Sequence, residues 1–155
     1  MLIPILLGSE SDREFASKIT KILDEFKVPY EIVVVSAHKA PEKVLKIVQK
    51  LNKSKDAVCY ITIAGRSNGL SGVTAGSSIH PVIACPPFNS KEDYLINIHS
   101  TLQMPSDTPV LTVIDPSNAA LAAIRILALQ NKTLKEKLAN RIKKVKNSFN
   151  IKKLC

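Results

Sequence analysis

The sequence has no tryptophan, and Phe, Trp and Tyr together make up only 5% of its 155 residues. It also has no recognisable nucleic-acid-binding motif, so its composition does not favour a nucleic-acid partner. Long apolar runs are missing as well: none approaches the ~20 residues needed to span a bilayer. We therefore expect neither nucleic acid nor a membrane as a partner.

Cysteine is scarce, with Cys59, Cys85 and Cys155 as the three examples and no CxxC spacing between them. This pattern fits reduced thiols in a cytoplasmic protein better than a disulfide framework or a zinc site. The first residues, MLIPILLGSESD, lack the basic region and the cleavage site of a signal peptide. We predict a cytoplasmic protein without a bound metal.

The formal net charge of +9 is unevenly distributed. Residues 132–155 contain nine Lys/Arg and one Glu, whereas residues 1–131 contain thirteen Lys/Arg and twelve Asp/Glu. The body of the protein is therefore nearly neutral, and the excess charge is best explained as the solvated face of a C-terminal helix.

Short apolar runs alternate with helical patterns along the chain, which is long enough to bury a full core as a single domain over residues 1–155. Strands are predicted at 2–7, 30–35, 57–64, 82–85 and 110–114, and helices after each of them, including 72–78, 94–102 and 118–129. This rhythm predicts an α/β fold: a three-layer α/β/α sandwich around a flavodoxin-like parallel sheet of about five strands. Pro4 cannot donate to a strand ladder, so we expect irregular pairing there.

A last helix is predicted over residues 133–147, inside a basic amphipathic segment at 132–149 that a tail follows at 150–155. Leu134, Leu138, Ile142 and Val145 form one apolar line along this helix. We expect the line to pack on another subunit and the helix to serve oligomerisation.

Three polar clusters follow the first three strands, where open parallel sheets bind their ligands. In the first cluster, Gly8 permits a tight turn, and Ser9, Ser11 and Asp12 lead into a helix whose free N–H groups suit a phosphate. Capping alone is the competing explanation, because Ser9 with Asp12 and Ser11 with Glu14 both have capping-box spacing.

The second cluster is SAHKAP, which comprises Ser36, Ala37, His38 and Lys39 before a helix that begins at Pro41. The positive end of that helix dipole favours a neutral imidazole at His38, the form that can accept a proton and return it. Lys39 is a point charge suited to an anion. A histidine in a loop can equally be inert.

The third cluster, AGRSNGLSG, combines glycines that permit close backbone approach with the donors Arg66, Ser67 and Asn68. It matches neither a dinucleotide loop, nor a Walker A loop, nor a nucleophile elbow, so by itself it indicates only a small polar ligand. His99 shares a predicted helix face with Leu95 and Leu102, and we expect it to pack there.

Six segments, taken in their order along the chain, resemble the phosphoribosylaminoimidazole carboxylase family of purine biosynthesis. They are GSESD, VPYEIVVVSAHKAP, ITIAGRSNGLSG, VIACPP, LQMPSDTPV and NAALAAIRIL. The pair AGRSN and SAHK is similar to its class II enzymes, which use carbon dioxide itself. The class I mutases, which move a carboxyl group from the N5-carboxyamino isomer, carry a histidine-containing loop in place of AGRSN and SAHR in place of SAHK.

The resemblance implies that C4 of aminoimidazole ribonucleotide (AIR) attacks carbon dioxide and that His38 removes the C4 proton. It implies no cofactor, because neither metal, biotin nor ATP is needed. It further implies a homo-oligomer, an octamer built on tetramers. The residues it assigns to the substrate are Gly8, Ser9, Ser11, Asp12, Ser36, Ala37, Lys39, Gly65, Arg66, Ser67 and Asn68, with Ser9 and Lys39 at the phosphate and Asp12 at the ribose.

Two alternatives stay open at this point. One is the class I activity, an N5-carboxyaminoimidazole ribonucleotide mutase. The other is a sensor that binds a nucleotide phosphate on the same fold without catalysing a reaction.

Overall fold

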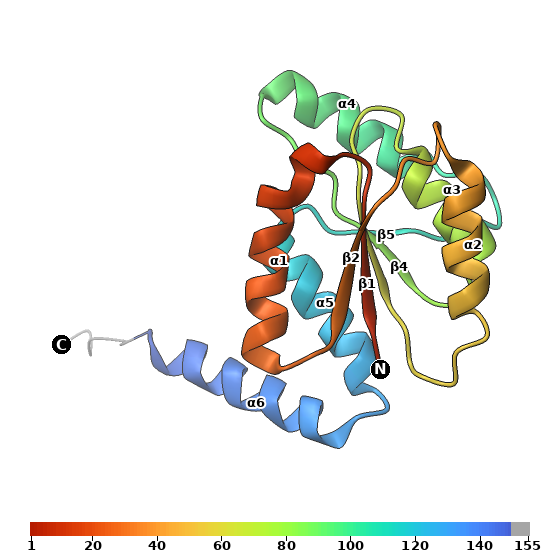
Figure 1. Ribbon diagram of the computed structural model, residues 1–155. Helices are drawn as coiled ribbons and strands as arrows, with labels where there is room; N and C mark the ends of the chain where they lie inside the picture. Colours follow the sequence, from red (N-terminus) through yellow and green to blue (C-terminus); the bar gives the residue numbers. More distant parts are fainter. Residues whose placement is uncertain (150–155) are drawn as a thin grey trace.

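The five predicted strands form one parallel sheet of order β2-β1-β3-β4-β5 in a computed structural model that describes residues 1–149 (Figure 1). The strands are β1 (Ile3–Leu7), β2 (Tyr30–Val34), β3 (Tyr60–Ile63), β4 (Val82–Ala84) and β5 (Leu111–Thr112). The order, with β1 between β2 and β3, is that of a flavodoxin-like sheet and confirms the predicted fold class.

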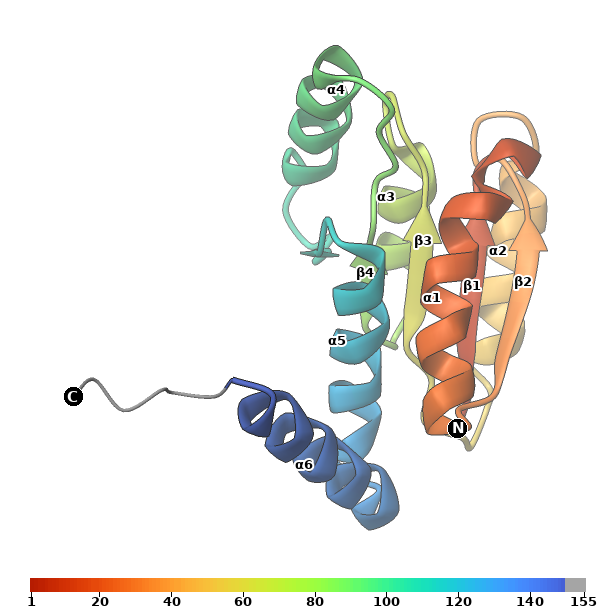
Figure 2. The ribbon, with the colours of Figure 1, turned by 90° about the vertical axis from the view of Figure 1, so that its left-hand side faces the viewer.

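Helices cover both faces of this sheet. On one face lie α1 (Arg13–Phe26) and α5 (Pro116–Ala128), and on the other lie α2 (Pro41–Leu51) and α3 (Gly69–Ser77) (Figure 1). Helix α4 (Lys91–Leu102) lies at the end of the molecule where the strands finish, and α6 (Lys132–Asn147) crosses the opposite end (Figure 2). The carboxyl ends of the strands are thus bordered by loops and α4.

Two apolar clusters fill the space between the sheet and its helices. Ile3, Ile5 and Leu7 of β1 belong to the cluster under α1 and α5, whereas Leu6 belongs to the cluster under α2 and α3. Because both faces of β1 are buried, its sequence is a continuous apolar run rather than an alternation of apolar and polar residues.

Pro4 lies in β1, which has neighbours on both sides. Its pairing with Glu31 of β2 is regular, but the continuous β1–β3 ladder starts only at Ile5 and Ile61, with an isolated bridge between Leu2 and Val58. The predicted irregularity is therefore present on the β3 side alone, where the proline offers no N–H.

Several boundaries differ from the prediction. Helix α3 begins at Gly69, three residues before the predicted start at Gly72, because Asn68 caps it by accepting the N–H of Ser71. Helix α4 begins at Lys91 rather than at Tyr94, because Ser90 accepts the N–H of Asp93. Both early starts come from caps that apolar periodicity does not reveal.

Helix α6 packs partly on its own chain. Leu134 and Leu138 are buried in the cluster under α1 and α5, and Lys137 donates a hydrogen bond to the carbonyl of Phe26. The outer half of the helix extends away from the sheet (Figure 1), and Ile142 and Val145 are exposed there. The predicted tail at 150–155 lies outside the described residues. Within residues 1–149, no helix combines the length and the apolar character needed to cross a membrane.

Candidate active site

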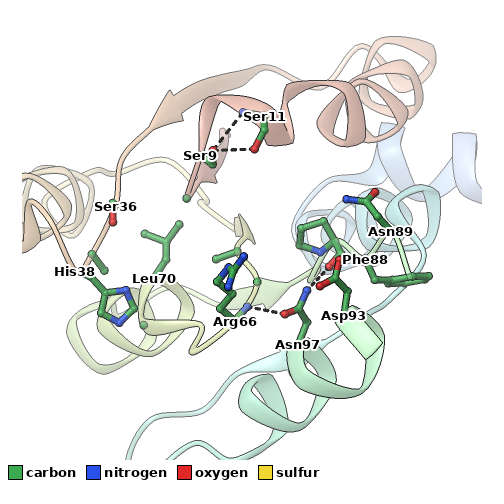
Figure 3. A pocket seen from close by; sticks show the side chains of 16 residues that line it. Ser9, Ser11, Ser36, His38, Arg66, Leu70, Phe88, Asn89, Asp93 and Asn97 are labelled. Atoms are coloured by element: carbon green, nitrogen blue, oxygen red, sulfur yellow. Dashed lines mark hydrogen bonds between the residues drawn. The ribbon is translucent and has the colours of Figure 1, made fainter. Parts of the chain in front are cut away.

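The carboxyl ends of β1, β2, β3 and β4 enclose a cavity of about 320 Å³ (Figure 3). This volume is at the lower end of the range of small-molecule sites. The lining residues are Gly8, Ser9, Ser11, Ser36, Ala37, His38, Ala64, Gly65, Arg66, Gly69, Leu70, Pro87, Phe88, Asn89, Asp93 and Asn97. The structure thus brings the three predicted polar clusters together at one site.

His38 lies on one side of this cavity, in the loop between β2 and α2 (Figure 3). Its Nε2 atom is 3.2 Å from the hydroxyl oxygen of Ser67, which can donate to this nitrogen or accept from it, depending on the tautomer. The ring also lies against the start of α3, since a Cβ atom at Gly69 would be 2.7 Å from Nε2. The imidazole is therefore exposed to the cavity and held by contacts with the third cluster.

The loop that carries Arg66, Ser67 and Asn68 has an unusual backbone. Arg66 and Asn68 adopt left-handed conformations with φ values of 56° and 32°. Residues other than glycine rarely adopt this backbone conformation unless the surrounding structure supports it, and such residues are often found at functional sites. Arg66 is exposed and lines the cavity, whereas the side chain of Asn68 is buried below the loop and bonds to Ser71 and Thr101.

The first cluster forms a capped turn. Ser9 accepts the N–H of Ser11, and the Asp12 carboxylate accepts the N–H of Ser9 at 3.1 Å, which confirms the predicted Ser9–Asp12 capping box. The second predicted box is wrong, because Asp12 rather than Ser11 is the N-cap of α1, and Asp12 makes no side-chain cap bond there. Burial raises the pKa of Asp12, and the hydrogen bond from Ser9 opposes this shift. Ser9 and Ser11 still present their hydroxyl groups to the cavity.

Four of the residues predicted to contact a ligand do not belong to the cavity lining in residues 1–149. They are Asp12, Lys39, Ser67 and Asn68. The Asp12 carboxylate is engaged by the N–H of Ser9, the Ser67 hydroxyl contacts the His38 ring, and Lys39 is exposed next to His38 in the sequence.

Sequence reasoning missed one wall of the cavity. Pro87, Phe88 and Asn89 follow β4, and Asp93 and Asn97 come from α4. The strand-end rule that identified the first three clusters applies equally to β4, so the CPPFN segment could have been found. The residues of α4 could not, because nothing local in the sequence places this helix beside the loop after β3.

His80, His99 and Cys85 do not line the cavity. His80 is half-buried, and its Nε2 is 3.0 Å from the carbonyl of Leu51. The prediction that His99 packs is wrong for this chain: His99 is exposed, because the α4 face with Leu95 and Leu102 points to solvent. Burial raises the pKa of Cys85 to about 12, with a further contribution from Asp115, and this disfavours the reactive thiolate.

The fold and the cavity define an α/β protein of flavodoxin-like architecture with a small-molecule-sized site at the carboxyl ends of its strands. The model of the AIR carboxylase family matches residues 2–148, and the chain belongs to this family of purine biosynthesis enzymes.

Relatives within the family carry both enzyme names. The chain is 40% identical over 134 residues to a phosphoribosylaminoimidazole carboxylase of Archaeoglobus fulgidus, which covers 86% of this chain and 73% of the relative. It is 44% identical over 147 residues to an N5-carboxyaminoimidazole ribonucleotide mutase of Methanocaldococcus jannaschii, with coverage of 94% and 90%. The crystal structure of Treponema denticola PurE superimposes with a TM-score of 0.88 at 38% identity, covering 95% of this chain and 92% of the other.

Proposed function

We propose that this protein is a class II AIR carboxylase, which reversibly carboxylates C4 of 5-aminoimidazole ribonucleotide with carbon dioxide. The observation that carries the proposal is the contact between His38 and the third cluster: a histidine whose Nε2 is 3.2 Å from Ser67 inside a loop of sequence AGRSN. Both SAHK and AGRSN resemble the class II pattern, and both contribute to the cavity lining, with Ser36, Ala37 and His38 from the first and Ala64, Gly65 and Arg66 from the second.

The reaction needs a single proton shuttle. The enamine carbon C4 forms a bond to carbon dioxide, whose π electrons move to oxygen, and C4 then bears both the new carboxylate and its original hydrogen. His38 accepts this proton as the ring regains aromaticity, and in the reverse direction it protonates C4 before carbon dioxide leaves. His38 suits this role because it is the histidine that lines the cavity, whereas His80 and His99 lie elsewhere.

The remaining cavity residues suit a nucleotide. Ser9 and Ser11 offer hydroxyl groups opposite His38 and Arg66 (Figure 3), and Lys39, next to His38 in the sequence, has a flexible stem that can reach a phosphate. Gly8, Ser36, Ala37 and Gly65 would border the base and the carboxylate. We assign Asp12 to the ribose hydroxyls, which requires its carboxylate to exchange the Ser9 N–H for the sugar.

A second candidate is the class I reaction, because the mutase of Methanocaldococcus jannaschii is 44% identical to this chain. The two activities differ in the substrate that is consumed. Family membership makes the third alternative, a sensor without activity, the weakest of the three.

The test is a spectrophotometric assay in which AIR with bicarbonate, the 4-carboxylate, and the N5-carboxyamino isomer are supplied separately. We expect turnover of the first two. Conversion of the N5-isomer alone would overturn the class II assignment in favour of the mutase.

The same assay on His38→Asn tests the proton shuttle. We expect a rate loss of at least ~100-fold, which is the usual contribution of a positioned acid or base. His99→Asn is the matched control, because His99 is exposed on α4 and does not line the cavity. A wild type without turnover, whose nucleotide affinity is unchanged in His38→Asn, would indicate a sensor.

We also propose that the protein assembles as a homo-oligomer, an octamer as in its family. The exposed Ile142 and Val145 on the outer half of α6 offer an apolar surface for a neighbouring subunit.

A further inference from the structure

Helix α4 holds the loop after β3 through a group of side chains on one of its faces. Asn97 accepts the N–H of Arg66 at 2.5 Å, and Ser100, one turn further along, donates to the carbonyl of the same residue. The hydroxyl of Thr101 accepts a hydrogen bond from the Asn68 side chain at 2.7 Å. Both polar groups of the Arg66 backbone and the side chain of Asn68 are therefore bound by α4.

This contact is buried and continues into the sheet. Asn68, Asn97 and Thr101 are exposed by 2%, 7% and 1% of their surfaces, so polar groups at these positions need partners. Asn68 also accepts from the Ser71 hydroxyl at 2.7 Å, and Ser71 lies 2.7 Å from the hydroxyl of Thr62 in β3. Asn97 donates to the carbonyl of Pro87 at 2.6 Å. The loop is thus tied to β3, α4 and the segment after β4.

The two residues that α4 holds, Arg66 and Asn68, are the two in this loop with left-handed backbone. Ser67 lies between them and makes the contact with Nε2 of His38. Gly65 leaves space for the arrangement, because a Cβ atom there would lie 2.7 Å from the Asn97 side chain. A change in the conformation of either flanking residue would therefore move the Ser67 hydroxyl relative to the imidazole.

We propose that Asn97, Ser100 and Thr101 are positioning residues: they hold residues 66–68 so that Ser67 fixes the His38 ring and Arg66 faces the cavity. They act through the loop and need not touch the reacting atoms. The inference deepens the proposed function, and its kinetic test rests on that function.

Thr101→Val tests the inference, and the chain contains a matched control. Thr101 donates to the carbonyl of Asn97, four residues before it in the helix, and Thr74 in α3 donates to the carbonyl of Leu70 in the same way. Both threonines are buried. Only Thr101 also accepts a bond from Asn68, so the difference between Thr101→Val and Thr74→Val isolates the link to the loop.

We expect Thr101→Val to lower kcat by roughly 10-fold or more with little change in KM, since a small displacement of a catalytic group reduces the rate strongly. Thr101→Ser keeps the hydroxyl and should restore kcat, and Thr74→Val should leave it near the wild-type value. A wild-type kcat in Thr101→Val, or a loss of the same size in Thr74→Val, would overturn the inference.

A second measurement does not depend on activity. The rate at which diethyl pyrocarbonate modifies His38, read by peptide mass spectrometry with exposed His99 as internal reference, reports the environment of the imidazole. We expect Thr101→Val, but not Thr74→Val, to change this ratio; an unchanged ratio contradicts the positioning role. If the wild type proves inactive, the proposed function fails while this ratio still decides the inference. If Thr101→Val does not fold, Ser100→Ala at a half-buried position replaces it, with the same two outcomes.

Discussion

Replacing Gly69 by alanine should lower the activity of this protein while leaving its free energy of unfolding nearly unchanged. Gly69 is the first residue of α3, and a Cβ atom built on it would lie 2.7 Å from Nε2 and 2.8 Å from Cε1 of His38. Non-bonded heavy atoms are normally separated by about 3.5 Å or more, so the imidazole must move by roughly 0.8 Å. His38 is exposed and can move without disturbing the core.

The expected loss of activity follows from this displacement. A catalytic group misplaced by ~1 Å can lower the rate by about 100-fold, so we expect kcat to fall by roughly 30- to 100-fold. This loss corresponds to about 2–3 kcal/mol of transition-state stabilisation. The free energy of unfolding should change by less than about 0.5 kcal/mol, because alanine is a better helix former than glycine and the first helical position gains little from it.

Gly76→Ala provides the control within the same helix. A Cβ atom there would lie 3.7 Å from the Thr108 hydroxyl, which is an ordinary contact. Because Gly76 is the last but one residue of α3, this variant should gain no more than about 0.5 kcal/mol in stability, and it should keep its kcat. Steady-state decarboxylation of the 4-carboxylate and thermal unfolding measure both quantities on each variant. Full kcat in Gly69→Ala would show that catalysis does not require the His38 ring beside Gly69.

Three further predictions concern other parts of the molecule. Burial raises the pKa of Cys59 from 9.0 to about 12, so the stabilising contribution of the protonated thiol is complete below pH 9 and is lost as the pH rises toward 12. Between these pH values, the free energy of unfolding of Cys59→Ala should fall by about 1.4 kcal/mol less per pH unit than that of the wild type. Denaturant titrations at several pH values measure the two slopes, and equal slopes would contradict this prediction. Lys39→Ala should raise KM for the nucleotide by roughly 5- to 30-fold with kcat nearly unchanged, because a phosphate contact stabilises the ground state and the transition state equally. A lower kcat with an unchanged KM would show that Lys39 does not bind the phosphate. Ile142→Ser combined with Val145→Ser should reduce the oligomer mass in sedimentation while the subunit stays folded, since both side chains are exposed on the outer half of α6, and an undiminished mass would exclude this surface as the interface.

The sheet and the three polar clusters were predictable because their signals are local. Apolar runs such as Leu2–Leu7 and Tyr30–Val35 identify the strands, and their alternation with helices requires parallel pairing. In a parallel sheet, residues directly after different strands meet at one edge, so the sequence places His38 and Ser67 at the same edge, where their side chains are in contact.

Helix α4 could not be predicted in the same way, because its buried face is polar. The apolar pattern predicts that Leu95, His99 and Leu102 face inward, yet the buried residues of the helix are Asn97 and Thr101. Their partners Arg66 and Asn68 are 31 and 33 residues away in the sequence. Predicting the buried face of a helix from its apolar residues assumes that burial favours apolar side chains. This assumption fails where a helix binds the polar backbone of a loop.

The same network explains why the loop keeps side chains at positions that would suit glycine. A left-handed conformation costs a residue with a side chain about 1–2 kcal/mol, less for asparagine, and glycine at positions 66 and 68 would avoid this cost. Glycine at these positions would also remove the guanidinium from the cavity and the Asn68 bonds to Ser71 and Thr101, and it would increase the freedom of the loop. The hydrogen bonds to α4 help to offset the strain of the conformation in which Ser67 reaches the imidazole. The proposed proton transfer by His38 would depend on this support, because the rate of such a step depends on where the catalytic group is held.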